Sequence, residues 1–289
     1  MSKILLTGSS GILGNSILSK LSDKYIFLSL KNQNEINQKY NQIKTKKLNF
    51  KYLRKIVIGF KPNVIIHAAA NTNIEDCQSN KKKCKKVNFE LTRNLVKISK
   101  LYNIKFIFIS TDQVYCKSFY QSEKTKIKSY NYYTETKILS ENFIKSNLKN
   151  YAILRTNFFG RSIALKKSFS DYIISSLKNL KRIFLFDDVY FNPINIDNLT
   201  RIIELIINNQ INGVFNIGVT QGLSKYQFGI KIAKKLNLNP NLIIKDNFLN
   251  RKDLSNRPLD MRMDVSKIKK IIKDNKLFNL NYNLSLLVK

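Results

Sequence analysis

The chain has little of what disulfide frameworks, zinc sites and membrane spans require. Its three cysteines are an odd number without a close Cys-x-x-Cys pair, so we expect reduced thiols and no metal site. No apolar run reaches the ~18–20 residues that cross a bilayer. An apolar strand is expected from residue 3 onward, which leaves no room for a signal peptide. These absences predict a soluble cytoplasmic protein.

Acidic residues are also scarce, with 19 Asp and Glu against 51 Lys and Arg, a net charge of +32. Such a charge can mark a nucleic-acid binder. Here the excess is mostly lysine, is spread along the chain and accompanies abundant Asn and Ile, whose codons are also A/T-rich. No basic–aromatic RNA motif or helix-turn-helix is present, so we expect neither nucleic acid nor membrane as a partner. The positive field could speed capture of a small anionic substrate.

Short apolar runs alternate with longer amphipathic segments, which predicts an α/β fold with a doubly wound parallel sheet. Its 289 residues suffice for one large domain with a small lobe. We expect a nucleotide-binding domain at 1–157, with parts of 185–217, and a smaller substrate-binding lobe at 158–184 and 218–289. The expected strands are 3–7, 25–30, 45–48, 63–68, 105–110, 151–156 and 214–217. The expected helices are 11–21, 52–59, 85–102, 132–148, 195–208 and 224–236.

A glycine-rich loop, Thr7–Gly14, follows the first expected strand and opens a helix. Gly8 would permit the tight turn, Gly11 the approach of a pyrophosphate, and Gly14 close packing of helix on strand. The free N–H groups of the helix N-terminus would face the phosphates. The loop therefore predicts a dinucleotide site.

Two further strand ends complete the pattern. Ala68, Ala69 and Ala70 end the fourth strand, where small residues let a cofactor lie against the backbone. The only histidine, His67, lies inside that strand, so we interpret it as a core residue rather than a general base. Thr111 follows the central strand, at the sheet edge where ligands bind in such folds.

Tyr133 and Lys137 form a Tyr-x-x-x-Lys pair on one expected helix. At i and i+4 their side chains share a face. Reduction of a carbonyl needs a proton donor, and a nearby ammonium would lower the phenol pKa from its usual ~10. Thr111 can hydrogen-bond the substrate oxygen. Tyr130 and Tyr132 have Thr rather than Lys four residues on, so they do not match the motif.

The Gly-x-x-Gly-x-x-Gly loop followed by Tyr-x-x-x-Lys resembles the short-chain dehydrogenase/reductase superfamily, with its Rossmann fold. Within it the chain looks most like extended enzymes acting on nucleotide sugars, and specifically the dTDP-4-dehydrorhamnose reductase family. The likeness runs almost end to end. The segments that carry it are 61–72, 110–115, 136–141, 154–160, 257–258 and 263–267.

This resemblance implies an NAD(P)H-dependent reductase that transfers a hydride to C4 of a nucleotide-linked 4-keto-6-deoxy sugar, in deoxysugar and surface polysaccharide biosynthesis. Tyr133 would be the general acid, Lys137 its partner, and Thr111 the hydroxyl at the carbonyl. Thr111, Asp112 and Phe158 would bind substrate. A homodimer would be usual for such enzymes. The implied cofactor-binding residues are Gly8, Gly11, Ile12, Leu13, Gly14, Lys31, Asn49, Phe50, Ala68, Ala69, Ala70, Asn88, Tyr133 and Lys137.

Several positions depart from the family pattern. No acidic residue ends the second strand, where Lys31 stands, which favours NADPH over NADH without excluding either cofactor. Asn49 replaces an Asp near the adenine, and Phe158 replaces the usual Trp. Ser129 and Thr134 replace a Pro and a Gly around the tyrosine. The reaction type is therefore better defined than the sugar.

Of three alternatives, the sequence opposes the first and leaves the other two open. A 4,6-dehydratase would need a glutamate where Gln113 stands, since an amide cannot act as that base. A nucleotide-sugar 4-epimerase shares the tyrosine–lysine pair. A non-catalytic NAD(P)-binding regulatory subunit could retain the fold without the activity.

Overall fold

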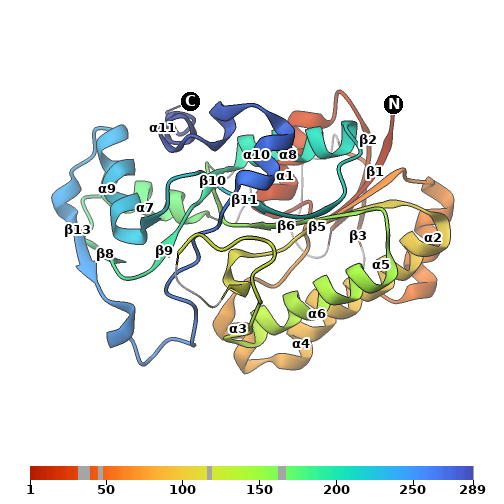
Figure 1. Ribbon diagram of the computed structural model, residues 1–289, viewed down its shortest axis with the longest axis horizontal. Coiled ribbons are helices and arrows are strands. Elements are labelled where there is room, and N and C mark those ends of the chain that lie inside the picture. Colours follow the sequence, from red (N-terminus) through yellow and green to blue (C-terminus); the bar gives the residue numbers. More distant parts are fainter. Residues whose placement is uncertain (32–39, 45–47, 116–118, 162–166, 289) are drawn as a thin grey trace.

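The computed structural model describes residues 1–31, 40–44, 48–115, 119–161 and 167–288 (Figure 1). A seven-stranded, all-parallel sheet has the order β11-β6-β5-β4-β1-β2-β3. This confirms the predicted doubly wound α/β class. Its strands are β1 (Lys3–Thr7), β2 (Ile26–Lys31), β3 (Gln42–Lys44), β4 (Val64–His67), β5 (Lys105–Ile109), β6 (Tyr151–Thr156) and β11 (Gly213–Ile217).

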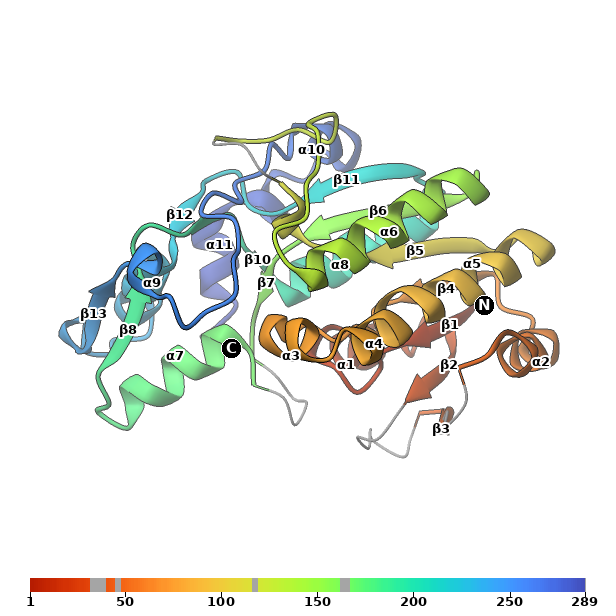
Figure 2. The same ribbon diagram turned by 90° about the horizontal axis from the view of Figure 1, so that it is seen from below.

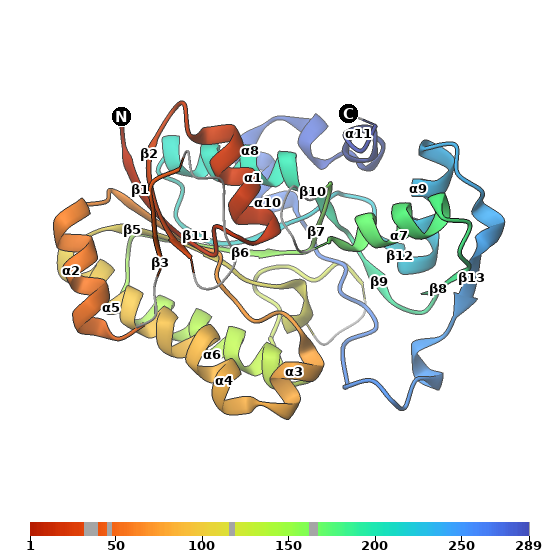
Figure 3. The same cartoon turned by 180° about the vertical axis from the view of Figure 1, so that it is seen from behind.

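Helices cover both faces of the sheet because its strands are apolar on both sides. In β1, Ile4 and Leu6 pack into one cluster and Leu5 into the other. The first face carries α1 (Ile12–Leu21), α8 (Ile196–Asn208) and α10 (Ser266–Ile272). The second carries α2 (Phe50–Phe60), α5 (Leu91–Tyr102) and α6 (Tyr132–Asn147), as Figures 1 and 3 show.

The helix expected at 85–102 begins earlier and changes form on the way. Asn80 caps α4 (Lys81–Lys85) by accepting a hydrogen bond from the Lys83 N–H, and a π-helical turn over Lys86–Glu90 leads into α5. The lysines of α4 are exposed and Cys84 alone is buried. The cap and the buried Cys84 stabilise a helix over the lysine run. The helix therefore begins at Lys81, and the start expected at residue 85 was wrong by four residues. The short α3 (Ile74–Ser79) precedes it.

The edge strand of the sheet lies before the position expected. Residues 45–47 of the expected strand at 45–48 fall outside the described residues, and Leu48 is not in a strand. The observed β3 instead pairs with β2, Ser29 opposite Gln42. Leu48 packs against the core from outside the sheet. Its apolar side chain therefore indicated burial correctly, but it did not indicate a strand.

A second hydrophobic cluster lies beside the sheet, at the left of Figure 2. Phe228 stands at its centre, with ring centroids 5.0 Å from Phe159 and 5.4 Å from Phe191. The cluster is built by α7 (Phe169–Lys178), β8 (Ile183–Phe186), α9 (Lys225–Lys235), β13 (Ile243–Asp246) and α11 (Leu280–Ser285), with Phe159 of β7 (Phe158–Phe159) and the short pair β9 (Tyr190–Phe191)–β12 (Leu223–Ser224). Strand β7 pairs with β10 (Ile194–Asn195), whose Ile194 packs into the cluster on the first face of the sheet. Within the described residues, every helix is too short or too polar to traverse a bilayer.

Candidate active site

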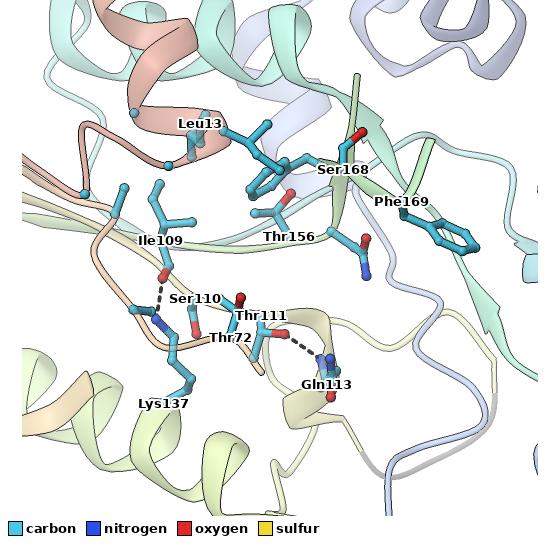
Figure 4. Close-up of a pocket in the computed structure, with 18 of the residues that line it drawn as sticks. Leu13, Thr72, Ile109, Ser110, Thr111, Gln113, Lys137, Thr156, Ser168 and Phe169 are labelled. Carbon is cyan, nitrogen blue, oxygen red and sulfur yellow. Dashed lines mark hydrogen bonds between the residues drawn. The ribbon is translucent and has the colours of Figure 1, made fainter. Parts of the chain in front are cut away.

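A cavity of about 370 Å³ opens at the carboxyl edge of the sheet, where the strand order reverses between β1 and β4. Ligands bind at such a reversal because the connections on its two sides diverge and leave a crevice. Figure 4 shows this cavity with its lining side chains. It is lined by Gly8, Gly11, Ile12, Leu13, Gly14, Ala68, Ala70, Thr72, Ile109, Ser110, Thr111, Gln113, Tyr133, Lys137, Thr156, Asn157, Phe158, Lys167, Ser168 and Phe169.

The glycine loop leaves no space for a side chain at Gly8 or Gly14. Gly8 has a φ of +75°, and a Cβ there would lie 2.6 Å from the Ala69 nitrogen. A Cβ on Gly14 would lie 2.2 Å from the carbonyl oxygen of Gly8. Gly11 caps α1, whose first N–H groups have no intrahelical partners. The loop therefore forms a backbone cradle suited to a pyrophosphate.

The residues that follow β4 pack against this glycine loop. Ala68 and Ala70 line the cavity, whereas the Ala69 N–H donates to the Thr7 hydroxyl (3.3 Å). The ring of His67 is buried, with its nitrogens 2.6 Å from the Thr7 hydroxyl and 2.9 Å from that of Thr92. Burial lowers the pKa of His67 to about 3. The interpretation of His67 as a core residue is confirmed, and its lowered pKa keeps the ring neutral.

Helix α6 presents Tyr133 and Lys137 to the same cavity, at its N-terminal end. A capping box between Asn131 and Thr134 fixes where the helix starts. The Lys137 ammonium donates to the carbonyl oxygen of Ile109 (2.6 Å), the bond drawn in Figure 4. Thr111, two residues after β5, lies beside Tyr133 and lowers the pKa of its phenol against the effect of burial. The predicted acid, its partner and the predicted hydroxyl thus line one cavity.

Burial dominates the proton affinities of this pair. It raises the pKa of Tyr133, with Asp112 adding to the increase, and it lowers the pKa of Lys137 to about 7. We expected a nearby ammonium to lower the phenol pKa, and the structure shows the opposite direction. The reason is that both groups are almost fully withdrawn from water, which disfavours phenolate and ammonium alike. Tyr133 is accordingly held as the neutral phenol, the form that can donate a proton.

A buried ionic network fixes α6 against the sheet one turn beyond Lys137. Glu141 forms a salt bridge with Arg155 of β6 (2.6 Å) and accepts from the Ser110 hydroxyl (2.6 Å). Arg155 also donates to the Tyr115 hydroxyl (2.9 Å). Breaking such a pair is costly because it leaves an uncompensated buried charge. The network therefore holds the α6 face that carries Tyr133 and Lys137.

Asn88 lies in the π-helical turn, behind the cavity rather than in its wall. Its side-chain amide donates to the Asn71 carbonyl (3.0 Å) and to the Thr136 hydroxyl (3.1 Å). Its backbone carbonyl accepts from the hydroxyls of Thr92 (2.7 Å) and Ser140 (3.0 Å). Asn88 thus joins the β4 loop, α5 and α6.

Four other predicted residues lie outside the cavity lining. Lys31 ends β2, Asn49 caps α2 by accepting from the Tyr52 N–H (2.9 Å), and Phe50 opens that helix. Asp112 is buried, which raises the pKa of its carboxyl to about 6.

A second cavity of about 260 Å³ adjoins the first and belongs largely to the second hydrophobic cluster. Lys225, at the start of α9, places its ammonium 3.3 Å from the centre of the Phe191 ring, and Arg257 lines the same cavity. Removal from water lowers the pKa of Lys225 to about 8, with Asp112 opposing that shift and Arg257 adding to it. The remaining lining residues are Gln113, Asn157, Phe169, Tyr172, Phe184, Leu185, Phe186, Val189 and Met261.

Sequence reasoning missed most of this second cavity. Asn157 could have been found, because it directly follows a predicted strand at the edge where ligands bind. Phe169 and Lys225 carry no such signal, since each is one of many phenylalanines or lysines. The aromatic residue predicted for the substrate, Phe158, lines the first cavity, whereas Phe169 lines both.

Comparison with known sequences gives a family match along almost the whole chain. Residues 2–282 match the RmlD substrate binding domain family. A dTDP-4-dehydrorhamnose reductase of Aggregatibacter actinomycetemcomitans is 26% identical, covering 93% of this chain and 92% of that protein. A dTDP-D-glucose 4,6-dehydratase of Dictyostelium discoideum is 25% identical over 81% of this chain, which spans only 61% of the dehydratase.

Solved structures give a similar result. A hypothetical dTDP-4-dehydrorhamnose reductase of Sulfolobus tokodaii superposes with a TM-score of 0.86 at 28% identity, over 98% of this chain and 99% of that one. A dTDP-4-dehydrorhamnose reductase of Bacillus anthracis, in complex with NADP, has a TM-score of 0.87 at 21% identity, over 100% and 99% of the chains. At that lower identity the second likeness shows a shared fold.

Proposed function

This chain belongs to the RmlD substrate binding domain family, and we propose that it is a nicotinamide-dependent reductase of a nucleotide-linked 4-keto-6-deoxy sugar. The observation that carries the proposal is the meeting of two predicted motifs in one cavity. The glycine cradle forms one side, and Thr111, Tyr133 and Lys137 form the other. The sequence of the A. actinomycetemcomitans reductase, alignable over nearly its full length, supports the same reaction.

The residues of the cradle fit a dinucleotide. Gly8 and Gly14 let the loop pack closely on the end of β4 and on α1, and the first N–H groups of α1 would be free to bind phosphate oxygens. When bound, the reduced nicotinamide would supply the hydride. We propose NADPH over NADH because Lys31, rather than an acidic residue, ends β2 and would favour a 2′-phosphate.

The chain's own residues would supply the proton. We propose that Thr111 holds the sugar carbonyl oxygen and that Tyr133 donates its phenolic proton to that oxygen as C4 is reduced. The ammonium of Lys137 would stabilise the tyrosinate that remains. Glu141 supports this charge, since it raises the pKa of Lys137 against the effect of burial.

The second cavity is suited to the nucleotide portion of the substrate. Lys225 and Arg257 place two cations on its wall, which would attract a diphosphate. Tyr172 and Phe184 add partly exposed aromatic faces on which a base could stack.

We therefore propose that residues 158–184 and 218–289 form mainly a substrate-binding lobe beside a cofactor domain at 1–157. Helix α8 and strand β11, within 185–217, would belong to the cofactor domain, because they complete its sheet and one of its clusters. Helix α10 would belong there too, because it packs into the same cluster.

Two alternatives use the same cavity. Gln113 opposes a dehydratase, because an amide cannot act as the base that removes a proton. A 4-epimerase would keep its cofactor through purification, whereas a reductase must exchange it at each turnover. Assay of the oxidised and reduced cofactor released when the purified protein is denatured therefore separates these two activities.

The decisive experiment measures oxidation of NADPH and NADH with dTDP-4-keto-6-deoxyglucose, with and without a 3,5-epimerase. We expect turnover that Tyr133→Phe reduces by ~10²–10⁴-fold, because the proton donor is lost while the ring is kept. Tyr132→Phe is the matched control, since the Tyr132 ring contacts Lys81 and does not line the cavity. Full activity of Tyr133→Phe would refute the mechanism, and absence of any cofactor binding would refute the enzyme itself.

A further inference from the structure

Three residues line both cavities: Gln113, Asn157 and Phe169. A ligand that occupies both cavities must therefore pass between two amides and one aromatic ring. Figure 4 shows Gln113 and Phe169 among the side chains around the first cavity. In the proposed substrate, the part that lies between the reacting carbonyl and the diphosphate is the sugar ring. These three residues are thus placed to contact the sugar.

The backbone of Gln113 is fixed. Its N–H donates to the Thr111 hydroxyl (3.2 Å), and it lies in a 3₁₀ turn over Asp112–Val114. The next two residues, Val114 and Tyr115, are fully buried and pack against Met263. The side chain of Gln113 therefore projects from a rigid support, directly beside the hydroxyl proposed to hold the carbonyl.

The amide oxygen of Gln113 nevertheless lacks a hydrogen-bond donor among the described residues, although it is shielded from solvent. A buried acceptor without a donor is costly, because it has lost its bonds to water and gained none in return. The oxygens of two other buried amides are satisfied: that of Asn192 accepts from the Met263 N–H (3.1 Å), and that of Asn216 accepts from the Tyr115 hydroxyl (2.6 Å). An unmet acceptor on a cavity wall points to a donor that arrives with a ligand.

We propose that Gln113 determines which sugar is accepted, by receiving a hydrogen bond from a ring hydroxyl of the nucleotide sugar. This inference rests on the proposed function. A site built to bond a hydroxyl rejects analogues that lack it, because its own polar group is then left unpaired. Gln113 is a specificity-determining residue in this assignment, separate from the proton transfer by Tyr133.

The test measures binding rather than turnover, by titration calorimetry with dTDP, dTDP-glucose and the 2-deoxy and 3-deoxy analogues of dTDP-glucose. The variant Gln113→Met keeps the length of the side chain and removes its hydrogen bonds. We expect it to bind dTDP-glucose about tenfold more weakly, as the loss of ~1.4 kcal/mol implies, and dTDP unchanged. One of the two deoxy analogues should bind the native protein weakly. Its affinity should be the same for the native protein and for Gln113→Met.

Two further variants complete the design. Gln113→Glu keeps an acceptor oxygen at the same reach and should retain more sugar discrimination than Gln113→Met. Gln221→Met, at an exposed position away from both cavities, is the matched control and should bind all four ligands as the native protein does.

The possible outcomes are distinct. Equal weakening of dTDP and dTDP-glucose by Gln113→Met would overturn the assignment, because the residue would then act on the nucleotide or on folding. Unchanged affinity for every ligand would overturn it as well. If the native protein binds dTDP and dTDP-glucose with the same affinity, the sugar role of Gln113 is refuted while the proposed function is not. If it binds neither dTDP nor dTDP-glucose, the nucleotide-sugar function fails and takes this inference with it.

Discussion

The two cavities meet at one wall but are built in different ways. One side of the first is formed by backbone and small residues of two short segments, Gly8–Gly14 and Ala68–Ala70, and the facing side by side chains that include Thr111 and those of α6. The second is formed by side chains from separated segments of the chain, among them Asn157, Lys225 and Arg257. In the first cavity, the close approach of the loop backbone determines which ligand can bind. In the second cavity, charged and aromatic side chains determine it.

This difference predicts different sensitivities to mutation. In the cradle, one added methyl group must displace backbone atoms, because the nearest neighbours are main-chain atoms. In the second cavity, a side chain can be replaced without moving the backbone, so the loss is one of interaction with the ligand. Mutations that add volume should therefore be most damaging in the first cavity, and mutations that remove charge in the second.

The largest effect is expected for Gly14→Ala. An added Cβ would meet the Gly8 carbonyl at 2.2 Å and the Ser9 Cα at 2.7 Å. We expect the free energy of unfolding to fall by ~1–3 kcal/mol and NADPH binding to weaken at least tenfold, because α1 must shift from the cradle. Chemical denaturation and a fluorescence titration with NADPH measure the two effects.

Gly59→Ala is the matched control for this substitution. Gly59 also lies within a helix, α2, but a Cβ there meets no atom within 4 Å. The same change should therefore raise the free energy of unfolding by ~0.5–1 kcal/mol, since alanine favours a helix over glycine. Destabilisation by both variants would show that close approach in the cradle is not the cause.

In the second cavity, Lys225→Met should raise the KM for the nucleotide sugar by ~10–100-fold and leave the Kd of NADPH unchanged. The reason is loss of a cation that faces Asp112 and Arg257 at the proposed diphosphate site. Lys234→Met, on an exposed position of the same helix, removes an equal charge as a control. A weakened Kd for NADPH would show that the two cavities do not divide the ligands as proposed.

The same lysine predicts a pH dependence. Since the pKa of Lys225 is lowered to about 8, its ammonium is present below pH 8 and is lost as the pH rises above it. The KM for the nucleotide sugar should accordingly rise above pH 8 in the native enzyme. In Lys225→Met that rise should be absent, which steady-state kinetics between pH 6 and 10 would measure. A rise of equal size in both proteins would assign the titration to another group.

The way each cavity is built also decides how much of it the sequence could predict. The cradle follows from glycines at fixed spacing between a strand and a helix, and Tyr133 and Lys137 follow from the i and i+4 geometry of one helix. Such local patterns are visible in the chain. The sheet was predictable for the same reason, except at its edge, where β3 is only three residues long.

The residues that sequence reasoning missed depend on contacts between distant segments. Glu141 meets Arg155 across the helix–sheet interface, and Lys225 lines the second cavity, near Asp112, only because of where α9 packs. Nothing local distinguishes Lys225 from the chain's other lysines. The directions of the pKa shifts were hidden for the same reason, because they depend on how deeply Tyr133 and Lys137 are buried.

The smallest effect is expected where the two regions are joined at the surface. Glu75 of α3 accepts a hydrogen bond from Arg257 (2.5 Å) and so draws one cation of the second cavity toward the sheet domain. Both side chains are partly exposed, so Glu75→Gln should change the free energy of unfolding by less than ~1 kcal/mol. Removing the competing carboxylate should nevertheless strengthen dTDP binding severalfold, more at low ionic strength than at high.

Glu135→Gln, exposed on α6 and not in the lining of either cavity, removes the same charge and should leave dTDP affinity unchanged. Weaker dTDP binding in Glu75→Gln would instead show that the ion pair positions Arg257 for the diphosphate, which would make the sheet domain part of the second cavity's binding site.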